Sequence, residues 1–287
     1  MVNRRVSLRS EPPSGPVYTY PEHLRPALAT LPRLPGVYIF HGESDTLPLY
    51  IGKSINIRNR VMSHFRTPEE AALLQQTRRI SWQQTAGELG ALLLEASLIK
   101  EQQPLFNKRL RRNRQLCSLQ LRGNRPEVVY SRDVDFSHTP DLYGLFANRR
   151  AALEMLKSLA DEQQLCYSVM GLESLNRGRA CFRSMLGRCA GACCGRETLD
   201  AHNARLRQGM MHLQLVCWPW KAAIALEEKG EGLTQFHIIH NWYWLGAVTS
   251  LTEAQTLKRS ASGFDQDGYK ILCRPLLSGT YPIHVLE

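Results

Sequence analysis

Two short segments, each with a tyrosine, an apolar residue and a glycine, constrain the fold of this chain more than any other feature. The first is Gly36-Val37-Tyr38 and the second is Tyr50-Ile51-Gly52, and eleven residues separate the two tyrosines. Apolar and aromatic residues at 37–40 and 49–51 favour strands, and the residues between them are typical of turns. The pattern therefore predicts a β-hairpin that carries two tyrosines.

The residues after the hairpin predict helices and one more strand. Ile57, Val61 and Phe65 recur every four residues, which predicts an amphipathic helix over 55–65. Three further elements are expected: a helix over 69–79, a strand over 80–85 and a helix over 88–103, which Pro104 ends. This order implies a small, mainly antiparallel three-stranded sheet with helices packed on it.

Composition and spacing divide the chain into four expected parts. These are an extended N-terminal arm at 1–30, the hairpin domain at 31–108, a basic linker with a small α/β piece and a cysteine-rich region at 109–215, and a mostly β domain at 216–287. In the last two parts we expect strands at 115–121, 127–131, 236–239, 242–248 and 269–274, and helices at 147–162 and 197–215. The predicted fold class is thus α+β.

The charge distribution favours a polyanionic partner. The chain of 287 residues has a formal net charge of +10, and the basic excess lies on its first two-thirds. Ordinary solvated surface charge is the alternative interpretation. The densest basic run supplies the candidate DNA-binding residues Lys108, Arg109, Arg111 and Arg112. Because no apolar stretch is typical of a signal sequence or a membrane span, we expect a cytoplasmic protein.

An isolated acid in an apolar run predicts a metal site. Glu95 is the one acid between Glu88 and Glu101, and it is flanked by leucines and an isoleucine. Burying an unpaired carboxylate costs several kcal/mol, and a bound divalent cation offsets that cost. A single hard oxygen ligand, completed by water and phosphate, suits Mg²⁺ or Mn²⁺. A glutamate on a solvated helix surface is the alternative.

Tyrosine, lysine and arginine near this acid form a set that can hydrolyse a phosphodiester. Tyr50 is the candidate general base, and since a phenol has a pKa of about 10 it needs a nearby cation, for which Lys53 is close in sequence. Tyr38 is expected to position Tyr50 or to exchange roles with it. Arg60 can place its planar guanidinium on the scissile phosphate. The alternatives are tyrosines packed in the core and a solvated arginine.

Two more polar residues join the candidate site. His64 lies one helical turn after Arg60, so both are expected on one helix face, where His64 either protonates the leaving group or contacts phosphate. Asn107 is expected to orient water or a neighbouring side chain, or else to cap the turn after Pro104.

Four cysteines predict a second metal site. Cys166, Cys181, Cys189 and Cys193 lie within 28 residues, and glycines punctuate the segment. Because the chain shows no secretory signal, thiols or a metal are favoured over disulfides. Four thiolates suit either Zn²⁺ or an iron–sulfur cluster. The adjacent Cys194 leaves open which thiol is the fourth ligand.

The hairpin resembles the GIY-YIG endonuclease family. Within that family, Tyr50-Ile51-Gly52-Lys53, Asn59-Arg60 and Leu94-Glu95-Ala96-Ser97-Leu98-Ile99-Lys100 resemble the N-terminal domain of UvrC, the excision-repair nuclease. Asn107 matches an asparagine that UvrC places twelve residues after its catalytic glutamate. His64 departs from the pattern, because UvrC usually has a tyrosine there. The resemblance implies the GIY-YIG nuclease fold and catalytic roles for Tyr38, Tyr50, Lys53, Arg60, His64, Glu95 and Asn107, with a divalent cation on Glu95.

The resemblance also implies a cofactor and partners. The segment from Gly187 to Cys193 is similar to the cysteine-rich region of UvrC, which carries a [4Fe–4S] cluster, so this cluster is expected on the four cysteines, with Zn²⁺ as the alternative. The chain ends at residue 287, before the further domains of UvrC. We therefore expect a short UvrC homologue that makes one incision, 3′ to a lesion in double-stranded DNA. UvrA and UvrB are the expected partners, with the C-terminal region contacting UvrB.

Two other functions fit the same residues. The first is a stand-alone structure-specific or site-specific DNA nuclease of the same fold, which needs no repair partner. The second is a non-catalytic nucleic-acid-binding protein with a structural metal site. The presence of Glu95 among leucines argues against the second, because a binding protein has no need of that acid.

Overall fold

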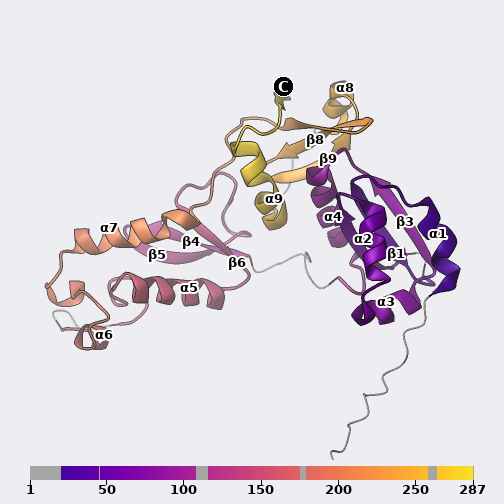
Figure 1. The fold of residues 1–287 in the computed structure, drawn as a ribbon. Coiled ribbons are helices and arrows are strands. Elements are labelled where there is room, and N and C mark those ends of the chain that lie inside the picture. The colour runs from indigo at the N-terminus through magenta and orange to yellow at the C-terminus, as the bar shows by residue number, and fades with distance from the viewer. Residues whose placement is uncertain (1–20, 45, 108–115, 175–178, 258–263, 287) are drawn as a thin grey trace, which may run out of the picture.

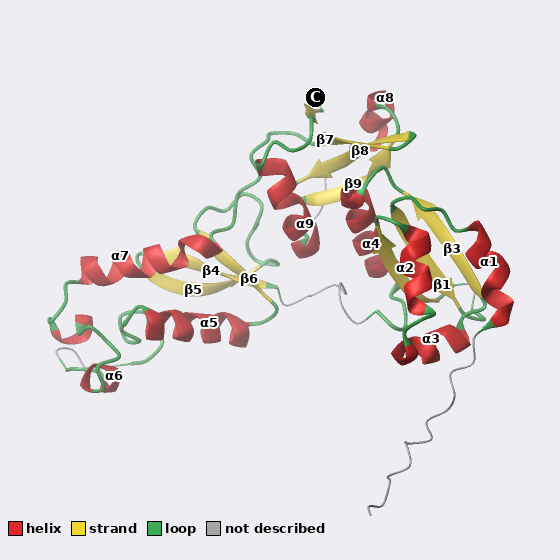
Figure 2. Ribbon diagram, in the orientation of Figure 1, coloured by secondary structure: helices red, strands yellow, loops and turns green. Residues whose placement is uncertain are grey.

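The computed structural model describes residues 21–44, 46–107, 116–174, 179–257 and 264–286. Three antiparallel sheets organise these residues, with strand orders β2-β1-β3, β5-β4-β6 and β10-β7-β8-β9. Figure 1 shows the first and third sheets side by side, with the second set apart from them. The secondary structure is mapped in Figure 2. The predicted α+β fold class is confirmed.

The first sheet contains the predicted hairpin. Its strands are β1 (Gly36–His41), β2 (Pro48–Ser54) and β3 (Arg79–Gln84), with β1 in the middle. The helices of this domain are α1 (Arg25–Thr30), α2 (Ile57–His64), α3 (Ala71–Gln76) and α4 (Glu88–Gln102), together with the short 3₁₀ helices η1 (Glu22–Leu24) and η2 (Pro68–Glu70). The β-β-α-α-β-α order expected from the sequence is therefore confirmed.

Alternation along β1 separates the two faces of this sheet. Tyr38 and Phe40 join the core that α1, α2 and α3 close, whereas Val37 joins Ile51 and the α4 residue Ile99. Side chains on a strand point alternately to opposite faces, so one strand supplies both cores. The tyrosine of the first motif segment consequently lies on the face covered by α2.

The N-terminal segment differs from the expected extended arm where it is described. Residues 22–30 form η1 and α1, and Leu24 and Leu28 are buried in the core of the first domain. Pro26 stands at the first turn of α1, where its missing N–H costs nothing. A proline is therefore compatible with the start of a helix, and the extended arm expected over 1–30 is not found at residues 22–30. Residues 1–20 lie outside the described residues.

The middle domain is a three-stranded sheet with two long helices. It comprises β4 (Cys117–Arg122), β5 (Arg125–Tyr130), β6 (Leu142–Phe146), α5 (Arg149–Glu162), α6 (Phe182–Met185), the 3₁₀ helix η3 (Ala192–Cys194) and α7 (Leu199–Met210). Asn148 caps α5 by accepting a hydrogen bond from the backbone N–H of Ala151, and Thr198 caps α7. The strands expected at 115–121 and 127–131 and the helix expected at 147–162 are found as β4, β5 and α5. The helix expected over 197–215 ends at Met210 and is followed by the 3₁₀ helix η4 (Met211–Leu213), and β6 was not expected. The cysteine-rich segment lies between α5 and α7.

The described part of the C-terminal domain consists of the four-stranded sheet, the helices α8 and α9 and the short 3₁₀ helix η5 (Gln255–Leu257). Its elements are β7 (Ile224–Gly230), β8 (Leu233–His240), β9 (Tyr243–Val248), β10 (Ile283–Val285), α8 (Leu251–Ala254) and α9 (Gln266–Leu277). The expected strand over 269–274 is wrong, because this segment lies within α9. Asp265 caps the helix, and Tyr269, Leu272 and Leu276 follow helical spacing and are buried.

Helix α4 is shared between the first and third sheets. Its residues Leu89 and Leu93 belong to the same buried cluster as Leu226, Trp242 and Leu272 of the C-terminal domain. Figure 1 accordingly shows α4 beside α9 and β9. Each helix in the described part of the chain is too short or too polar to cross a membrane.

Candidate active site

The rings of Tyr38 and Tyr50 lie close together because Gly52, which is paired with Tyr38, has no side chain. Tyr38 is paired with Gly52 across β1 and β2, and a Cβ atom on Gly52 would lie 2.4 Å from Tyr38 Oη and 2.8 Å from Tyr50 Cε1. The ring centroids of Tyr38 and Tyr50 are 6.2 Å apart. The glycine of the second motif segment therefore leaves the space that the Tyr38 ring occupies.

We expect Gly52→Ala to displace the Tyr38 ring and to lower the rate of DNA incision at least tenfold. The added methyl meets a ring that packs in the core, and overpacking of this kind costs about 1–3 kcal/mol. Gly42→Ala in the same hairpin is the control, because its Cβ would lie 3.3 Å from the flexible Leu49 side chain. Incision rates and thermal unfolding of both variants test this, and equal rates for the two would contradict it.

His64 lies behind Tyr38 rather than at the surface. The hydroxyl of Tyr38 is 2.7 Å from His64 Nε2, and His64 Nδ1 contacts the carboxylate of Glu70. His64 is only 1% exposed, and burial lowers its pKa although Glu70 opposes this. The neutral ring donates a hydrogen bond from Nδ1 to Glu70 and accepts one at Nε2 from the hydroxyl of Tyr38. This position differs from the expected contact of His64 with phosphate.

Glu70 was not anticipated from the sequence. It ends the short helix η2 and is the second of two adjacent acids, which is typical of a solvated helix start. Only the fold places it against His64. Nothing in the spacing distinguishes it from Glu69, so sequence reasoning had no means of selecting it.

Arg60 and Glu95 reach the tyrosines from two different helices. Arg60 lies on α2 and is exposed, with Nη1 3.3 Å from Ser63 Oγ. Glu95 lies on α4, and its Oε1 accepts the backbone N–H of Lys53 at 3.0 Å. Among the described residues, no hydrogen bond reaches the other oxygen of Glu95. One carboxylate oxygen is therefore available to a ligand.

Electrostatic coupling shows that these groups share one site. Burial raises the pKa of Tyr50, and Glu95 raises it further, whereas Arg60 lowers it. Burial likewise raises the pKa of Glu95, while the Lys53 backbone N–H, the Lys53 charge and Arg60 lower it. Burial also raises the pKa of Tyr38, and Arg60 opposes that effect. The structure thus brings together the tyrosines, Arg60 and Glu95.

Lys53 takes a different partner from the expected one. Its Nζ donates to Glu88 Oε1 at 2.7 Å, at the start of α4. Arg60 rather than Lys53 is the cation that lowers the pKa of Tyr50. Lys53 nevertheless lowers the pKa of Glu95 and holds that carboxylate through its backbone.

Asn107 forms two hydrogen bonds with the backbone of β2, the strand that carries Tyr50. Its Oδ1 accepts the N–H of Ile51 at 2.9 Å, and its Nδ2 donates to the carbonyl of Ile51 at 2.9 Å. Phe106 N also donates to the Leu49 carbonyl at 2.8 Å. The segment after α4 thereby extends the edge of β2 beside Tyr50, which was not among the expected roles of Asn107.

The four predicted cysteines converge at the end of the middle domain. The sulfur atoms of Cys166, Cys181, Cys189 and Cys193 all lie within 4.8 Å of one another, and Cys194 is outside this group. The first three are buried, and they form a local cluster with few other apolar residues. Burial raises the pKa of Cys193 to about 11, so without a metal this thiol is neutral at pH 7.

Exposed side chains surround the cysteine cluster. Phe182, Met185 and Leu186 of the α6 turn are each more than half exposed, and Arg179 and Arg188 are exposed beside them. Arg183 instead pairs with Asp161 and covers the ring of Tyr167. The candidate DNA-binding residues Lys108, Arg109, Arg111 and Arg112 lie outside the described residues.

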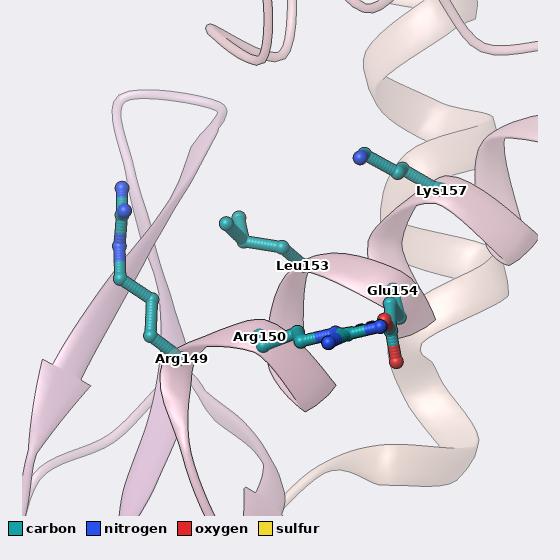
Figure 3. Close-up of a pocket in the computed structure, with 5 residues that line it drawn as sticks. All are labelled: Arg149, Arg150, Leu153, Glu154 and Lys157. Atoms are coloured by element: carbon teal, nitrogen blue, oxygen red, sulfur yellow. Dashed lines mark hydrogen bonds and ion pairs between the residues drawn. The ribbon is translucent and has the colours of Figure 1, made fainter.

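A shallow pocket on α5 is separate from the tyrosine site. It is lined by Arg149, Arg150, Leu153, Glu154 and Lys157, as Figure 3 shows. Arg150 Nε donates to Glu154 Oε1 at 2.7 Å, and Arg149 and Lys157 are exposed. The pocket holds no Tyr, His or Glu–metal arrangement among the described residues that line it. It is a basic surface and not the catalytic centre.

Comparison with known families assigns all three domains. Residues 34–108 match the UvrC-like GIY-YIG domain, residues 116–212 the middle domain of UvrC/Cho excinucleases, and residues 223–287 the C-terminal domain of excinuclease Cho. The fold and the matched domains define a DNA endonuclease of the UvrC type.

Relatives that match the whole chain identify one family within the UvrC-type endonucleases. Excinuclease Cho of Escherichia coli O6:H1 is 67% identical over 287 residues, which cover 100% of this chain and 97% of that protein. Excinuclease Cho of Salmonella typhimurium is 68% identical over 283 residues, which cover 99% of this chain and 97% of that protein. The chain belongs to the excinuclease Cho family.

More distant relatives match a part of the chain. The UvrABC system protein C of Nitratidesulfovibrio vulgaris is 34% identical over 196 residues, which cover 64% of this chain and 27% of that protein. The GIY-YIG domain of UvrC from Thermotoga maritima, solved with its catalytic magnesium, is 32% identical, with a TM-score of 0.28 over 30% of this chain and 97% of that chain.

Proposed function

We propose that this endonuclease hydrolyses one phosphodiester on the 3′ side of a lesion, acting on a complex of UvrB with damaged DNA. The observation that carries the catalytic part is the electrostatic convergence of Tyr50, Arg60 and Glu95 at one site. The family of the chain supports the repair part, because excinucleases of this type work on damaged DNA. The single GIY-YIG domain supports one incision per event.

Tyr50 is proposed as the general base that, in its phenolate form, takes the proton of the attacking water at Oη and becomes the neutral phenol. Arg60 favours the phenolate, against burial and the charge of Glu95, and a cation bound to Glu95 would offset that charge. Tyr38 holds Tyr50 in place and is itself oriented by the His64–Glu70 pair. The hydrogen bond from the Tyr38 hydroxyl to neutral His64 fixes the Tyr38 ring, whose centroid lies 6.2 Å from that of Tyr50. This arrangement supports a positioning role for Tyr38 and His64.

Arg60 and Lys53 are proposed to stabilise charge on the phosphate. Arg60 is exposed and close enough to lower the pKa values of both tyrosines. A guanidinium can bind two phosphate oxygens at once and stabilise the charge that develops in the transition state. Lys53 can turn from Glu88 toward DNA, since that ion pair is half exposed. Asn107 keeps β2, and with it Tyr50, in register.

Glu95 is proposed as the protein ligand of Mg²⁺ or Mn²⁺. The donor fits, because this half-buried carboxylate has one oxygen that accepts no hydrogen bond from the described residues, and burial raises its pKa. Such a group gains most from a nearby divalent charge. A bound cation supplies Lewis-acid stabilisation of the phosphate and a lower pKa for bound water.

Cys166, Cys181, Cys189 and Cys193 are proposed to hold a [4Fe–4S] cluster, with Zn²⁺ as the alternative. The donor set fits both, since four cysteines without histidine ligate either group. A tetrahedral Zn²⁺ with Zn–S bonds of about 2.3 Å needs closely spaced sulfurs, and Cys166 Sγ lies 4.0 Å from Cys181 Sγ. All four sulfurs lie within 4.8 Å of one another, a spacing that favours the single Zn²⁺, whereas a [4Fe–4S] cluster would require the sulfurs to move apart. Metal analysis tests which of the two the cysteines hold.

The experiment that tests the function is incision of an end-labelled duplex with one bulky lesion, in the presence of Mg²⁺. We expect one cut, 3′ to the lesion, when UvrA, UvrB and ATP are supplied, and little cutting when UvrB is omitted. Equal incision without UvrB would instead favour a stand-alone structure-specific nuclease. Specific DNA binding without a cut under Mg²⁺ or Mn²⁺ would favour a non-catalytic binding protein.

A further inference from the structure

Helix α4 is held by the C-terminal domain as well as by the nuclease sheet. One side of the helix packs Ile99 against Ile51 of the sheet, and the other side packs Leu89 and Leu93 against Trp242 and the rest of the C-terminal core. A helix clamped between two cores cannot shift against one of them without disturbing the other. The helix that carries Glu95 is therefore common to both domains.

The start of α4 is capped by a side chain from β7. Glu228 accepts the backbone N–H of Leu89 and of Gly90, each at 2.9 Å. The first N–H groups of a helix have no partner within the helix, and the N-cap residue here, Gly87, has no side chain to offer one. Glu228 is 3% exposed, so these contacts are shielded from water.

Gly87 and Gly90 at the start of α4 leave room for the carboxylate of Glu228, because neither has a side chain. A Cβ on Gly87 would lie 2.4 Å from Glu228 Oε1, and one on Gly90 would lie 2.9 Å from Oε2. His237 fixes the same carboxylate through a contact of 3.0 Å between Nε2 and Oε2. Although burial raises the pKa of Glu228, hydrogen bonds from His237 and the two N–H groups keep it below its usual value. The cap is thus an ionised carboxylate at the positive end of a helix dipole.

The end of α4 is tied to the same domain. Lys100 forms ion pairs with Asp265 and with Asp267, at the start of α9. Glu95 lies between the two attachments, two helical turns after Glu88. Because Glu95 Oε1 must meet the Lys53 N–H on β2, the axial position and the tilt of α4 set where its carboxylate lies.

We propose that Glu228 is a positioning residue of the nuclease: by capping α4 from the C-terminal domain, it holds Glu95 in register with Tyr50 and Arg60. The C-terminal domain is then a structural part of the catalytic unit. This inference rests on the proposed role of Glu95. A displacement of about 1 Å in a catalytic group can cost about 100-fold in rate, so a helix cap can control the chemistry.

The test uses full-length Glu228→Gln, with Glu227→Gln as the matched control. Glu227 is the next residue on β7 and pairs with Lys229 and His284, away from α4. We expect Glu228→Gln to speed hydrogen–deuterium exchange of the 88–95 backbone in metal-free protein. It should also raise the Mn²⁺ concentration for half-maximal incision about tenfold, while the Kd for DNA stays within twofold. The control should match the unsubstituted protein in all three.

Lys100→Gln provides the second variant, since its ion pairs are partly exposed and their loss should not prevent folding. We expect Lys100→Gln to speed backbone exchange at the C-terminal end of α4. It should also raise the Mn²⁺ concentration for half-maximal incision, here called the Mn²⁺ midpoint, about threefold. If either variant speeds exchange in α4 and leaves the Mn²⁺ midpoint unchanged, Glu228 is only a stabilising cap and the proposal is wrong. Unchanged exchange in both variants would also overturn it. The rate of hydrogen–deuterium exchange does not depend on whether Glu95 binds the metal. If Glu95 is not the metal ligand, a Glu95 variant will keep its incision activity, and this result is distinct from the exchange measurement.

Discussion

Replacing Glu95 by glutamine is expected to lower single-turnover DNA incision by about 10³-fold at saturating Mg²⁺. Glutamine preserves the shape and one acceptor for the Lys53 N–H, but it removes the negative charge that we assign to cation binding. Charge stabilisation by a metal is worth several kcal/mol in the transition state, which corresponds to this loss. Gel-based incision of a lesion-bearing duplex measures it.

Glu101→Gln is the matched control, because this acid lies on the same helix and is exposed. It should cut at the normal rate. If Glu95→Gln retains normal incision while its fold and DNA affinity are intact, the assignment of the metal ligand is wrong.

The same substitution should make the metal-free protein more stable at neutral pH. Because burial raises the pKa of Glu95 above its unfolded value, the ionised form opposes folding, and stability is lost as pH rises through the folded pKa. Glutamine escapes this cost. The gain in Tm should therefore be present at pH 7.5 with chelator, and should shrink as the pH falls below the ordinary range of a glutamate. Loss of activity with a gain of stability separates a functional acid from a structural one.

Local patterns predicted the nuclease sheet and most of the residues in its site. The hairpin, the helix of Arg60 and the isolated acid on α4 all depend on short-range periodicity, and the structure brings Tyr50, Arg60 and Glu95 together. The helix α9 was missed because its N-cap, Asp265, is one of many acids and the apolar run after it also fits a strand. Short apolar runs do not distinguish the two by periodicity alone.

The residues that position the site were invisible to the same reasoning. Glu70 contacts His64 across a turn, and Glu228 reaches α4 from a strand 139 residues away from Leu89. Such contacts depend on how sheets and helices are arranged, which no local spacing encodes. Both are acids that look like ordinary surface charge in the sequence. The expectation that the Lys53 ammonium lies beside Tyr50 fails for a related reason. The ammonium pairs with Glu88, which is 35 residues away in the sequence.

The shared helix also changes how partner binding should be tested. Deleting 216–287 would remove the cap on α4 and expose Leu89 and Leu93, which are buried against that domain. Loss of UvrB-dependent incision in such a truncation would then report a damaged nuclease as readily as a lost UvrB contact. Single substitutions at exposed residues of the C-terminal domain, such as Tyr243 and Leu251, leave Glu228 in place and avoid this ambiguity.

Replacing Cys189 by serine is expected to abolish metal binding and to unfold the end of the middle domain. The local core there consists largely of the four cysteines, so a metal bound by them would supply most of its stability. Anaerobically purified protein should contain iron and absorb at about 400 nm, and the variant should lose both. Limited proteolysis should then cut within 166–196, while the nuclease sheet stays intact, because it has a separate core.

Cys194→Ser is the matched control, since this thiol adjoins Cys193 but lies outside the group of four sulfurs. It should keep the metal, the absorbance and the resistance to protease. Loss of metal in Cys194→Ser with retention in Cys193→Ser would show that the fourth ligand is the adjacent thiol. Zinc without iron in the anaerobic protein would replace the cluster by a tetrahedral ion, for which the 4.0 Å separation of Cys166 and Cys181 is already suited. In either case the four thiols act as a structural core, because too few apolar side chains remain there to hold the loops without a metal.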